Sequence, residues 1–238
     1  MTICFETIAQ TVSTNADMKA RAASGACEGF WLRAENQTGG VGRLGRKWES
    51  PKGNLFCSSL VEIRAGDPAP ASLSFVASLA VFDTIRHHLP STEIRLKWPN
   101  DVIVSGAKIC GILLERAGDK IVVGIGINVA VAPGVGDRAV TSMAAEGAAT
   151  ACDADTVLRL LATKFEARLQ DWRLSSVAAI LQTWQAHAHP VGSPITTSVA
   201  DGSKISGRFE GLTDDGALRL RKADGTLIEI RAGDIEVG

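Results

Sequence analysis

Apolar residues recur at helical spacing in several parts of the chain and in short, strand-like runs elsewhere. The longest helical pattern covers residues 72–89, and Pro90 ends it. A Ser-Thr-Asn triplet at residues 13–15 offers capping side chains to a helix that ends near Ala23. Two later helices are expected, one bearing Val157 to Leu169 and capped by Asp153 or Asp155, the other bearing Val177 to Trp184.

Strand-like runs fill most of the remaining sequence before residue 130. They are expected over residues 3–5, 30–35, 54–63, 93–98, 101–104, 108–115 and 121–129. A Ser-Gly-Ala triplet at 105–107 predicts a short hairpin. Residues 130–152 are rich in Ala, Gly and Pro and are interpreted as a loop with some helix. The order of helices and strands predicts an α+β fold.

The pattern of apolar and turn-forming residues changes after His189-Pro190. From Pro194 onward, short strands alternate with turns that contain glycine. This spacing predicts a small all-β barrel, with a domain boundary near residue 187. We therefore divide the chain into residues 1–186 and 187–238. The turns are expected at Asp201-Gly202, Asp215-Gly216, Asp224-Gly225 and Ala232-Gly233.

Composition narrows the class of protein. The chain has 238 residues and a formal net charge of −1, which argues against a dedicated nucleic-acid or membrane surface. Its five cysteines are widely spaced without a Cys-x-x-Cys pair, so we expect buried free thiols in a reducing cytoplasm rather than disulfides or a metal site. Neither a signal peptide nor a membrane span is expected.

A glycine-rich, basic stretch occupies residues 38–48. It contains four glycines around Arg43, Arg46 and Lys47. Glycines let the backbone approach a ligand closely, and arginines supply permanently charged donors for phosphate or carboxylate. The stretch is neither a Walker A loop nor a dinucleotide-binding fingerprint. It predicts an anion-binding loop that closes over its ligand, with a mobile, solvated surface loop as the alternative.

A second candidate region follows the strand that ends near Trp98. The sequence Lys97-Trp-Pro-Asn-Asp101 breaks the strand pattern, so that Asn100 and Asp101 face a ligand or form an ordinary turn. Lys108 begins the next strand and either points its ammonium at an anion or extends to solvent. Glycines inside strands permit close approach of a flat ligand. Those glycines are Gly111, Gly124 and Gly126, with Asn128 at the strand end.

In their order and spacing, these segments resemble the biotin–protein ligase family. The matching stretches are residues 13–15, 35–48, 97–104, 108–115 and 123–128, and the likeness covers essentially the whole chain. The resemblance implies a mixed-sheet catalytic domain, like that of class II synthetases, and an SH3-like C-terminal domain. It also implies a two-step reaction. Biotin and ATP, with Mg²⁺, form biotinyl-5′-AMP, and biotin then passes to a lysine of a biotin carboxyl carrier protein.

The resemblance also assigns roles to individual residues. Lys108, Arg43 and Asp101 would be catalytic, with Asp101 orienting or deprotonating the incoming amine. Biotin would be held by Ser13, Thr14, Asn15, Gln37, Gly40, Val41, Arg43, Lys108, Gly111, Gly124 and Gly126. The nucleotide would be held by Arg43, Arg46, Trp48, Lys97, Asn100 and Asn128.

Two loop positions depart from some relatives, which carry arginine where this chain has Val41 and Leu44. The first should matter little if only its backbone touches biotin, whereas the second removes charge from the loop. The sequence leaves no room for the N-terminal DNA-binding domain of some relatives, so DNA binding is not expected. A lipoyl or octanoyl transferase and a non-catalytic binding module stay open as alternatives. Both a monomer and a homodimer are compatible with the family.

Overall fold

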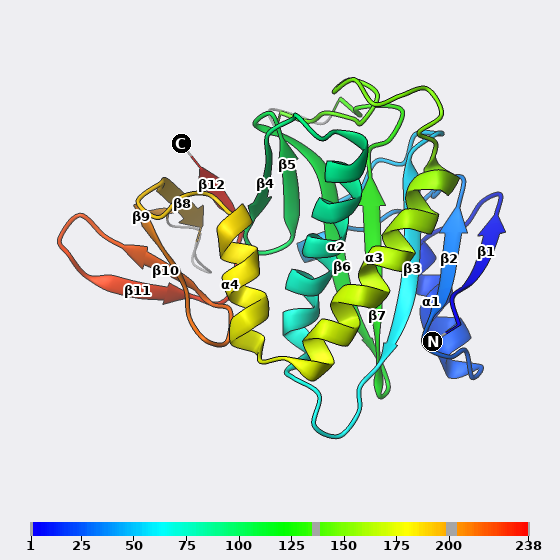
Figure 1. Ribbon diagram of the computed structural model, residues 1–238, viewed down its shortest axis with the longest axis horizontal. Helices are drawn as coiled ribbons and strands as arrows, with labels where there is room; N and C mark the ends of the chain where they lie inside the picture. The colour runs from blue at the N-terminus through cyan, green and yellow to red at the C-terminus, as the bar shows by residue number, and fades with distance from the viewer. Residues whose placement is uncertain (1, 135–138, 199–203, 238) are drawn as a thin grey trace.

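A mixed seven-stranded sheet forms the larger part of the molecule (Figure 1). The computed structural model describes residues 2–134, 139–198 and 204–237. The strands hydrogen-bond in the order β1-β2-β3-β7-β6-β5-β4; β1 runs parallel to β2, and every other pairing is antiparallel. Their bounds are β1 Cys4–Ile8, β2 Phe30–Ala34, β3 Leu55–Glu62, β4 Ile94–Lys97, β5 Asp101–Val104, β6 Ala107–Ala117 and β7 Lys120–Ile127.

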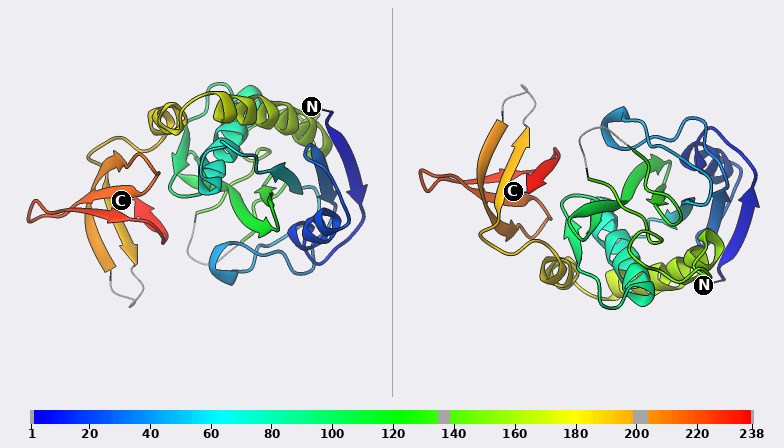
Figure 2. Two further views of the ribbon diagram at one scale, coloured as in Figure 1. Left: turned by 90° about the horizontal axis from the view of Figure 1, so that it is seen from below. Right: turned by 90° about the horizontal axis from the view of Figure 1, so that it is seen from above.

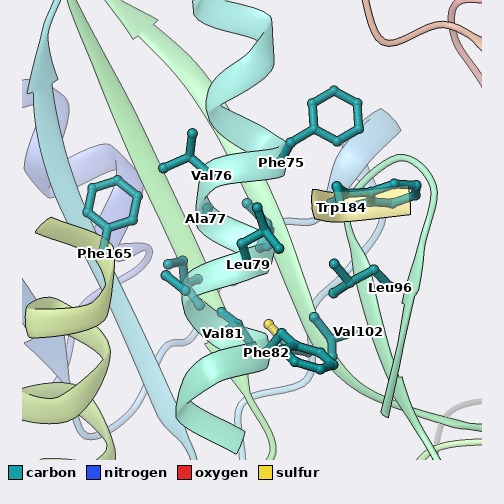
Figure 3. Packing of buried hydrophobic residues seen from close by; sticks show 14 of the residues in the cluster. Phe75, Val76, Ala77, Leu79, Val81, Phe82, Leu96, Val102, Phe165 and Trp184 are labelled. Atoms are coloured by element: carbon teal, nitrogen blue, oxygen red, sulfur yellow. The ribbon is translucent and has the colours of Figure 1, made fainter. Parts of the chain in front are cut away.

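Helices cover the two faces of this sheet unequally. One face packs against α2 (Leu73–His88), α3 (Ala154–Leu174) and α4 (Val177–His187), and the other against α1 (Thr14–Ala23) (Figure 2). Buried apolar side chains continue from the sheet through α2 to α3 and α4 (Figure 3). The Phe75 and Trp184 rings meet edge to face, with centroids 5.3 Å apart.

Sequence patterning predicted these elements closely, with two errors. Ser13 occupies the N-cap of α1 as expected, but its side chain makes no capping hydrogen bond. The helix expected over residues 72–89 is α2, and Asp153 rather than Asp155 caps α3 by accepting from the Thr156 backbone N–H. The hairpin between β5 and β6 is also confirmed, since both Ser105 and Gly106 have positive φ. The described part of 130–152 forms turns and contains no helix, so the helical content expected there is wrong.

The cysteine prediction is half right. All five cysteines are free thiols, as expected. Cys57 and Cys110 are buried, but Cys4 and Cys27 are exposed, so burial was wrongly expected for those two. Among the helices that the structure describes, none combines the length and apolar character needed to cross a membrane.

The C-terminal part forms a separate five-stranded antiparallel sheet at one end of the molecule (Figure 2). Its strands pair in the order β11-β10-β9-β8-β12. The α+β class is thus confirmed. The small all-β unit begins with β8, shortly after the pattern of the sequence changes at His189-Pro190. The bounds are β8 Pro194–Ser198, β9 Lys204–Leu212, β10 Leu218–Arg221, β11 Leu227–Ile230 and β12 Ile235–Val237.

The small sheet docks on the larger unit through the turn before β10. The Trp98 indole N–H donates to the Gly216 carbonyl over 3.0 Å. A Cβ at Gly216 would lie 2.6 Å from the Phe75 ring, and the Gly216 φ is +85°. Only glycine therefore satisfies both the backbone conformation and the close approach to α2.

Replacing Gly216 with alanine should lower the free energy of unfolding by about 2–4 kcal/mol, through backbone strain plus overpacking against Phe75. Gly225 is a matched control, because its φ is also +85° but a Cβ there meets nothing within 4 Å. Gly225→Ala should cost only about 1–2 kcal/mol. Urea unfolding of both variants checks the difference, and equal losses would contradict the packing argument.

Candidate active site

A single large cleft, with a volume of about 1280 Å³, brings the candidate residues together. It opens on the α1 face of the main sheet and reaches the small C-terminal sheet. The sequence analysis proposed 17 site residues, and 16 of them line this cleft. The exception is Gly40, which lies behind the wall, where a Cβ would be 2.7 Å from the Trp48 carbonyl oxygen. The 16 are Ser13, Thr14, Asn15, Gln37, Val41, Arg43, Arg46, Trp48, Lys97, Asn100, Asp101, Lys108, Gly111, Gly124, Gly126 and Asn128.

One end of the cleft is lined by the neutral polar side chains of Ser13, Thr14, Asn15 and Gln37. The start of α1 brings Thr14 against Gln37, whose Oε1 accepts from the Thr14 backbone N–H over 2.9 Å and from its hydroxyl over 3.2 Å. Asn15 lies directly over Gly124, where a Cβ would be 2.2 Å from Asn15 Oδ1. This end therefore suits a neutral ligand group that forms hydrogen bonds.

The glycines of β6 and β7 accommodate an indole ring. Trp48 lies across Gly111 and Gly126, and a Cβ at either glycine would come within 3.0 Å of the ring. These glycines were interpreted from the sequence as the wall of a slot for a flat ligand. In this structure the flat group against two of them is Trp48, and the group against Gly124 is Asn15.

An ion pair lies next to this ring. Lys108 Nζ is 2.6 Å from Asp101 Oδ1, and both side chains are largely buried. The ammonium is also 5.4 Å from the centre of the Trp48 ring. Asp101 ends up beside Lys108 because β5 and β6 pair antiparallel. In this arrangement the carboxylate serves as the partner of Lys108.

Two arginines of the glycine-rich loop form the cationic end of the cleft. Arg43 donates to Asn100 Oδ1 over 3.3 Å and to the Gly233 carbonyl over 3.2 Å. Arg43 and Arg46 both pair with Asp234, which lies directly before β12. Burial lowers the pKa of the Arg43 guanidinium, and the charge of Asp234 opposes that shift. The loop is thus joined to the C-terminal unit through a carboxylate.

The loop tip carries backbone strain. Leu44 has a φ of +57°, a backbone conformation that bulky residues rarely adopt. Its side chain is 79% exposed. Val41 is also exposed. Strain of this kind clusters at ligand clamps and switch regions.

Asn128 and Lys97 differ in their surroundings. Asn128 is buried, its Nδ2 donates to the Thr141 carbonyl, and its Oδ1 accepts from Asn54. The Asn128 amide is thus already bound on both sides by the protein, and its contact with a nucleotide stays a prediction. Lys97 ends β4 at the rim of the cleft.

Sequence reasoning assigned no role to three residues that the structure places in or next to the site. Ser58 and Glu115 contact Asn15, and Asp234 contacts the loop arginines. The signal for Ser58 was a pair of serines, Ser58 and Ser59, within an otherwise buried, apolar strand. Nothing local in the sequence connects Asp234 with residues about 190 positions earlier.

Two further observations concern the thiols and the metal-ligating side chains of the described residues. Burial raises the pKa of the Cys110 thiol well above its usual value, and burial likewise raises that of Cys57. Neither is therefore poised as a nucleophile. No group of three or more His, Cys, Asp or Glu residues in the described ranges could hold a metal ion.

Comparison with protein families agrees with this geometry. The model described as "Biotin/lipoate A/B protein ligase family" matches residues 10–131. The chain belongs to the biotin/lipoate A/B protein ligase family. A second model, "Biotin protein ligase C terminal domain", matches residues 192–238.

Members of the biotin/lipoate ligase family match along almost the whole chain. A biotin–[acetyl-CoA-carboxylase] ligase of Paracoccus denitrificans is 36% identical over 97% of this chain and 99% of its own. Its counterpart in Mycobacterium tuberculosis is 38% identical over 97% of this chain and 88% of its own. A biotin protein ligase from Aquifex aeolicus, solved with biotin and ATP, superposes with a TM-score of 0.84 at 26% identity, covering 99% of this chain and 98% of that one.

Proposed function

We propose that this chain is an ATP-dependent biotin–protein ligase. It forms biotinyl-5′-AMP from biotin and ATP and then transfers biotin to a lysine of a biotin carboxyl carrier domain. The observation that carries the proposal is the Lys108–Asp101 pair, which lies in one cleft between a neutral polar end and two arginines. This order of groups matches a ligand with a neutral ring system and an anionic tail that must meet a phosphate.

The first step joins two anions. A carboxylate oxygen of biotin attacks the α-phosphorus of ATP, the bond to the β-phosphate breaks, and pyrophosphate leaves. Lys108 offsets the repulsion by donating to both the carboxylate and the α-phosphate. Asp101 holds the ammonium at the reacting centre through their 2.6 Å contact.

Biotin lies along the α1 face of β6 and β7. Thr14 and Gln37 bind its ring system, and the strand glycines let Asn15 and Trp48 lie close against the strands beside it. The cleft geometry around α1 supports this placement. The complete proposed set for biotin is Ser13, Thr14, Asn15, Gln37, Gly40, Val41, Arg43, Lys108, Gly111, Gly124 and Gly126.

The nucleotide lies toward the loop arginines. Arg43 and Arg46 hold its phosphates, Trp48 packs near the adenine, and Lys97, Asn100 and Asn128 complete the nucleotide side. Mg²⁺ arrives bound to ATP, since phosphates together with one or two carboxylates suffice for it. Asp101 and Asp234 are the cleft carboxylates nearest the arginines and Lys108.

In the second step the carrier lysine attacks the carbonyl carbon of the adenylate. The carbon–nitrogen bond forms, the carbon–oxygen bond to the phosphate breaks so that AMP leaves, and the proton lost by the amine passes by way of Asp101 to solvent. We assign to Asp101 the role of orienting or deprotonating that amine, on the support of its position in the cleft beside Lys108. Residues 1–186 perform the chemistry and residues 187–238 supply contacts to the loop. We place the reaction in the cytoplasm, on the support of five free cysteines.

Biotin-dependent ATP–pyrophosphate exchange on the purified protein tests the proposal, with lipoate and octanoate as parallel acids. Exchange with biotin alone is expected. Exchange with lipoate or octanoate instead would move the chain to the other branch of its family. No exchange with any of the three acids would leave a binding module as the better description.

A further inference from the structure

Ser58 lies behind the cleft, in the centre of β3, on the face that packs against α1. It is fully buried. Its hydroxyl oxygen is 2.8 Å from Thr14 Oγ1 and 2.6 Å from Asn15 Oδ1. Ser58 thus joins the two cleft-lining residues at the start of α1 from beneath.

The Asn15 side chain has a fixed direction. Its Nδ2 donates to Glu115 Oε2 over 2.8 Å, and Lys19 Nζ is 2.5 Å from the other carboxylate oxygen. Burial raises the pKa of Glu115, but hydrogen bonds from Lys19 and Asn15 outweigh it and lower the pKa overall. An ionised carboxylate only accepts, so the Asn15 nitrogen must face Glu115 and its oxygen must face Ser58.

Counting protons shows what this network offers a ligand. Three oxygen–oxygen contacts link Asn15 Oδ1, Ser58, Thr14 and Gln37 Oε1 in a row. Only the hydroxyls of Ser58 and Thr14 carry protons to fill them, because both amide oxygens are acceptors. Asn15 Oδ1 needs a donor, so the Ser58 hydroxyl donates to it and the Thr14 hydroxyl donates to Ser58 or to Gln37 Oε1. The Thr14 hydroxyl oxygen and Gln37 Oε1, which also accepts from the Thr14 backbone N–H, keep acceptor capacity at the cleft lining, and a ligand N–H complements it.

We infer that Ser58 is a positioning residue that, with Asn15 and Glu115, makes this end of the cleft select acids whose head group carries N–H donors. The inference rests on the proposed function and deepens it. The ureido ring of biotin has two N–H groups. The dithiolane of lipoate and the alkyl end of octanoate have none, so they offer no donor to the Thr14 and Gln37 oxygens at the cleft lining.

The test compares two adjacent serines of the same strand. Ser58 and Ser59 point to opposite faces of β3 and are both buried, but the Ser59 hydroxyl bonds the Phe30 carbonyl, away from the cleft. Ser58→Ala should weaken biotin binding about tenfold, because Asn15 Oδ1 loses its donor. Calorimetric titration with biotin measures this, and Ser59→Ala should stay within about twofold of the unaltered protein.

Two further measurements separate positioning from general damage. In Ser58→Ala, ATP binding and the exchange rate at saturating biotin should be unchanged, whereas a damaged fold lowers both. If Ser58→Ala fails to fold, Glu115→Gln tests the same network through the nitrogen of Asn15. A glutamine can present either end of its amide to Asn15, so biotin binding should weaken about fivefold.

Biotin binding within twofold of the unaltered protein in both Ser58→Ala and Glu115→Gln would overturn the inference. An equal loss in Ser58→Ala and Ser59→Ala would do the same. These outcomes differ from failure of the proposed function, in which the unaltered protein neither binds biotin nor catalyses exchange.

Discussion

Replacing Lys108 with alanine should slow biotin-dependent ATP–pyrophosphate exchange by on the order of 100-fold or more. The ammonium is the cation closest to Asp101 and to the Trp48 ring, in the middle of the cleft. Without it, the biotin carboxylate and the α-phosphate approach each other beside an unpaired, largely buried Asp101 carboxylate. The loss should fall on kcat, because the interaction strengthens as negative charge gathers on the transferring phosphoryl group.

Lys204→Ala is the matched control for Lys108→Ala. Lys204 lines the same cleft from the small sheet, but it is exposed and pairs with Glu236 at 3.5 Å. Its removal should change the exchange rate by less than about threefold. A Lys108→Ala protein that retains its fold and exchanges as fast as Lys204→Ala would remove Lys108 from the mechanism.

Replacing Arg43 with glycine should release biotinyl-5′-AMP into solution, at a rate about 10 to 100 times that of the unaltered protein. Arg43 reaches Asn100 on the main unit and Gly233 and Asp234 on the small one, so it holds the loop across the cleft. Its loss also removes a charged donor to the adenylate phosphate. The freed mixed anhydride reacts with any nearby amine, so biotin should appear on lysines of a bystander protein such as albumin.

Lys47→Gly controls for loss of charge and for added flexibility in the same loop. Lys47 is exposed and pairs with Glu49 within the loop, at 2.8 Å. Labelling of the bystander should therefore stay near that of the unaltered protein. If Arg43→Gly labels the bystander no faster than Lys47→Gly, Arg43 does not retain the intermediate.

Local patterning predicted the helices and strands well because each depends on nearby residues. The 130–152 segment was misjudged because long-range pairing decides its structure. The Lys108 N–H donates to the Ala139 carbonyl, and the Met143 N–H donates to that of Asn128. Such bonds draw the segment out along β6 and the end of β7, despite its alanine-rich composition. The pairing of β7 with β3 is equally long-range, whereas its pairing with β6 follows from the short turn at Gly118 and Asp119.

The candidate site was predictable where motifs are contiguous. The loop around Arg43 and the strand beginning at Lys108 could be recognised as units. The residues that hold site side chains in place could not be recognised. Ser58 contacts Thr14 and Asn15 only after distant segments pair, and Asp234 contacts the loop arginines only after the small sheet docks. The sequence also gave no indication that Trp48 would lie against Gly111 and Gly126.

The docked C-terminal sheet affects how this protein can be dissected. A chain cut near residue 187 would expose the Phe75 ring and leave the Trp98 indole N–H without its acceptor, Gly216. It would also lack Asp234, the carboxylate that pairs with Arg43 and Arg46 of the loop. Loss of activity in such a truncation would therefore report a broken interface as much as a missing contribution to chemistry. A chimera between relatives has to exchange the turn around Gly216, the strand end at Asp234 and the glycine-rich loop together.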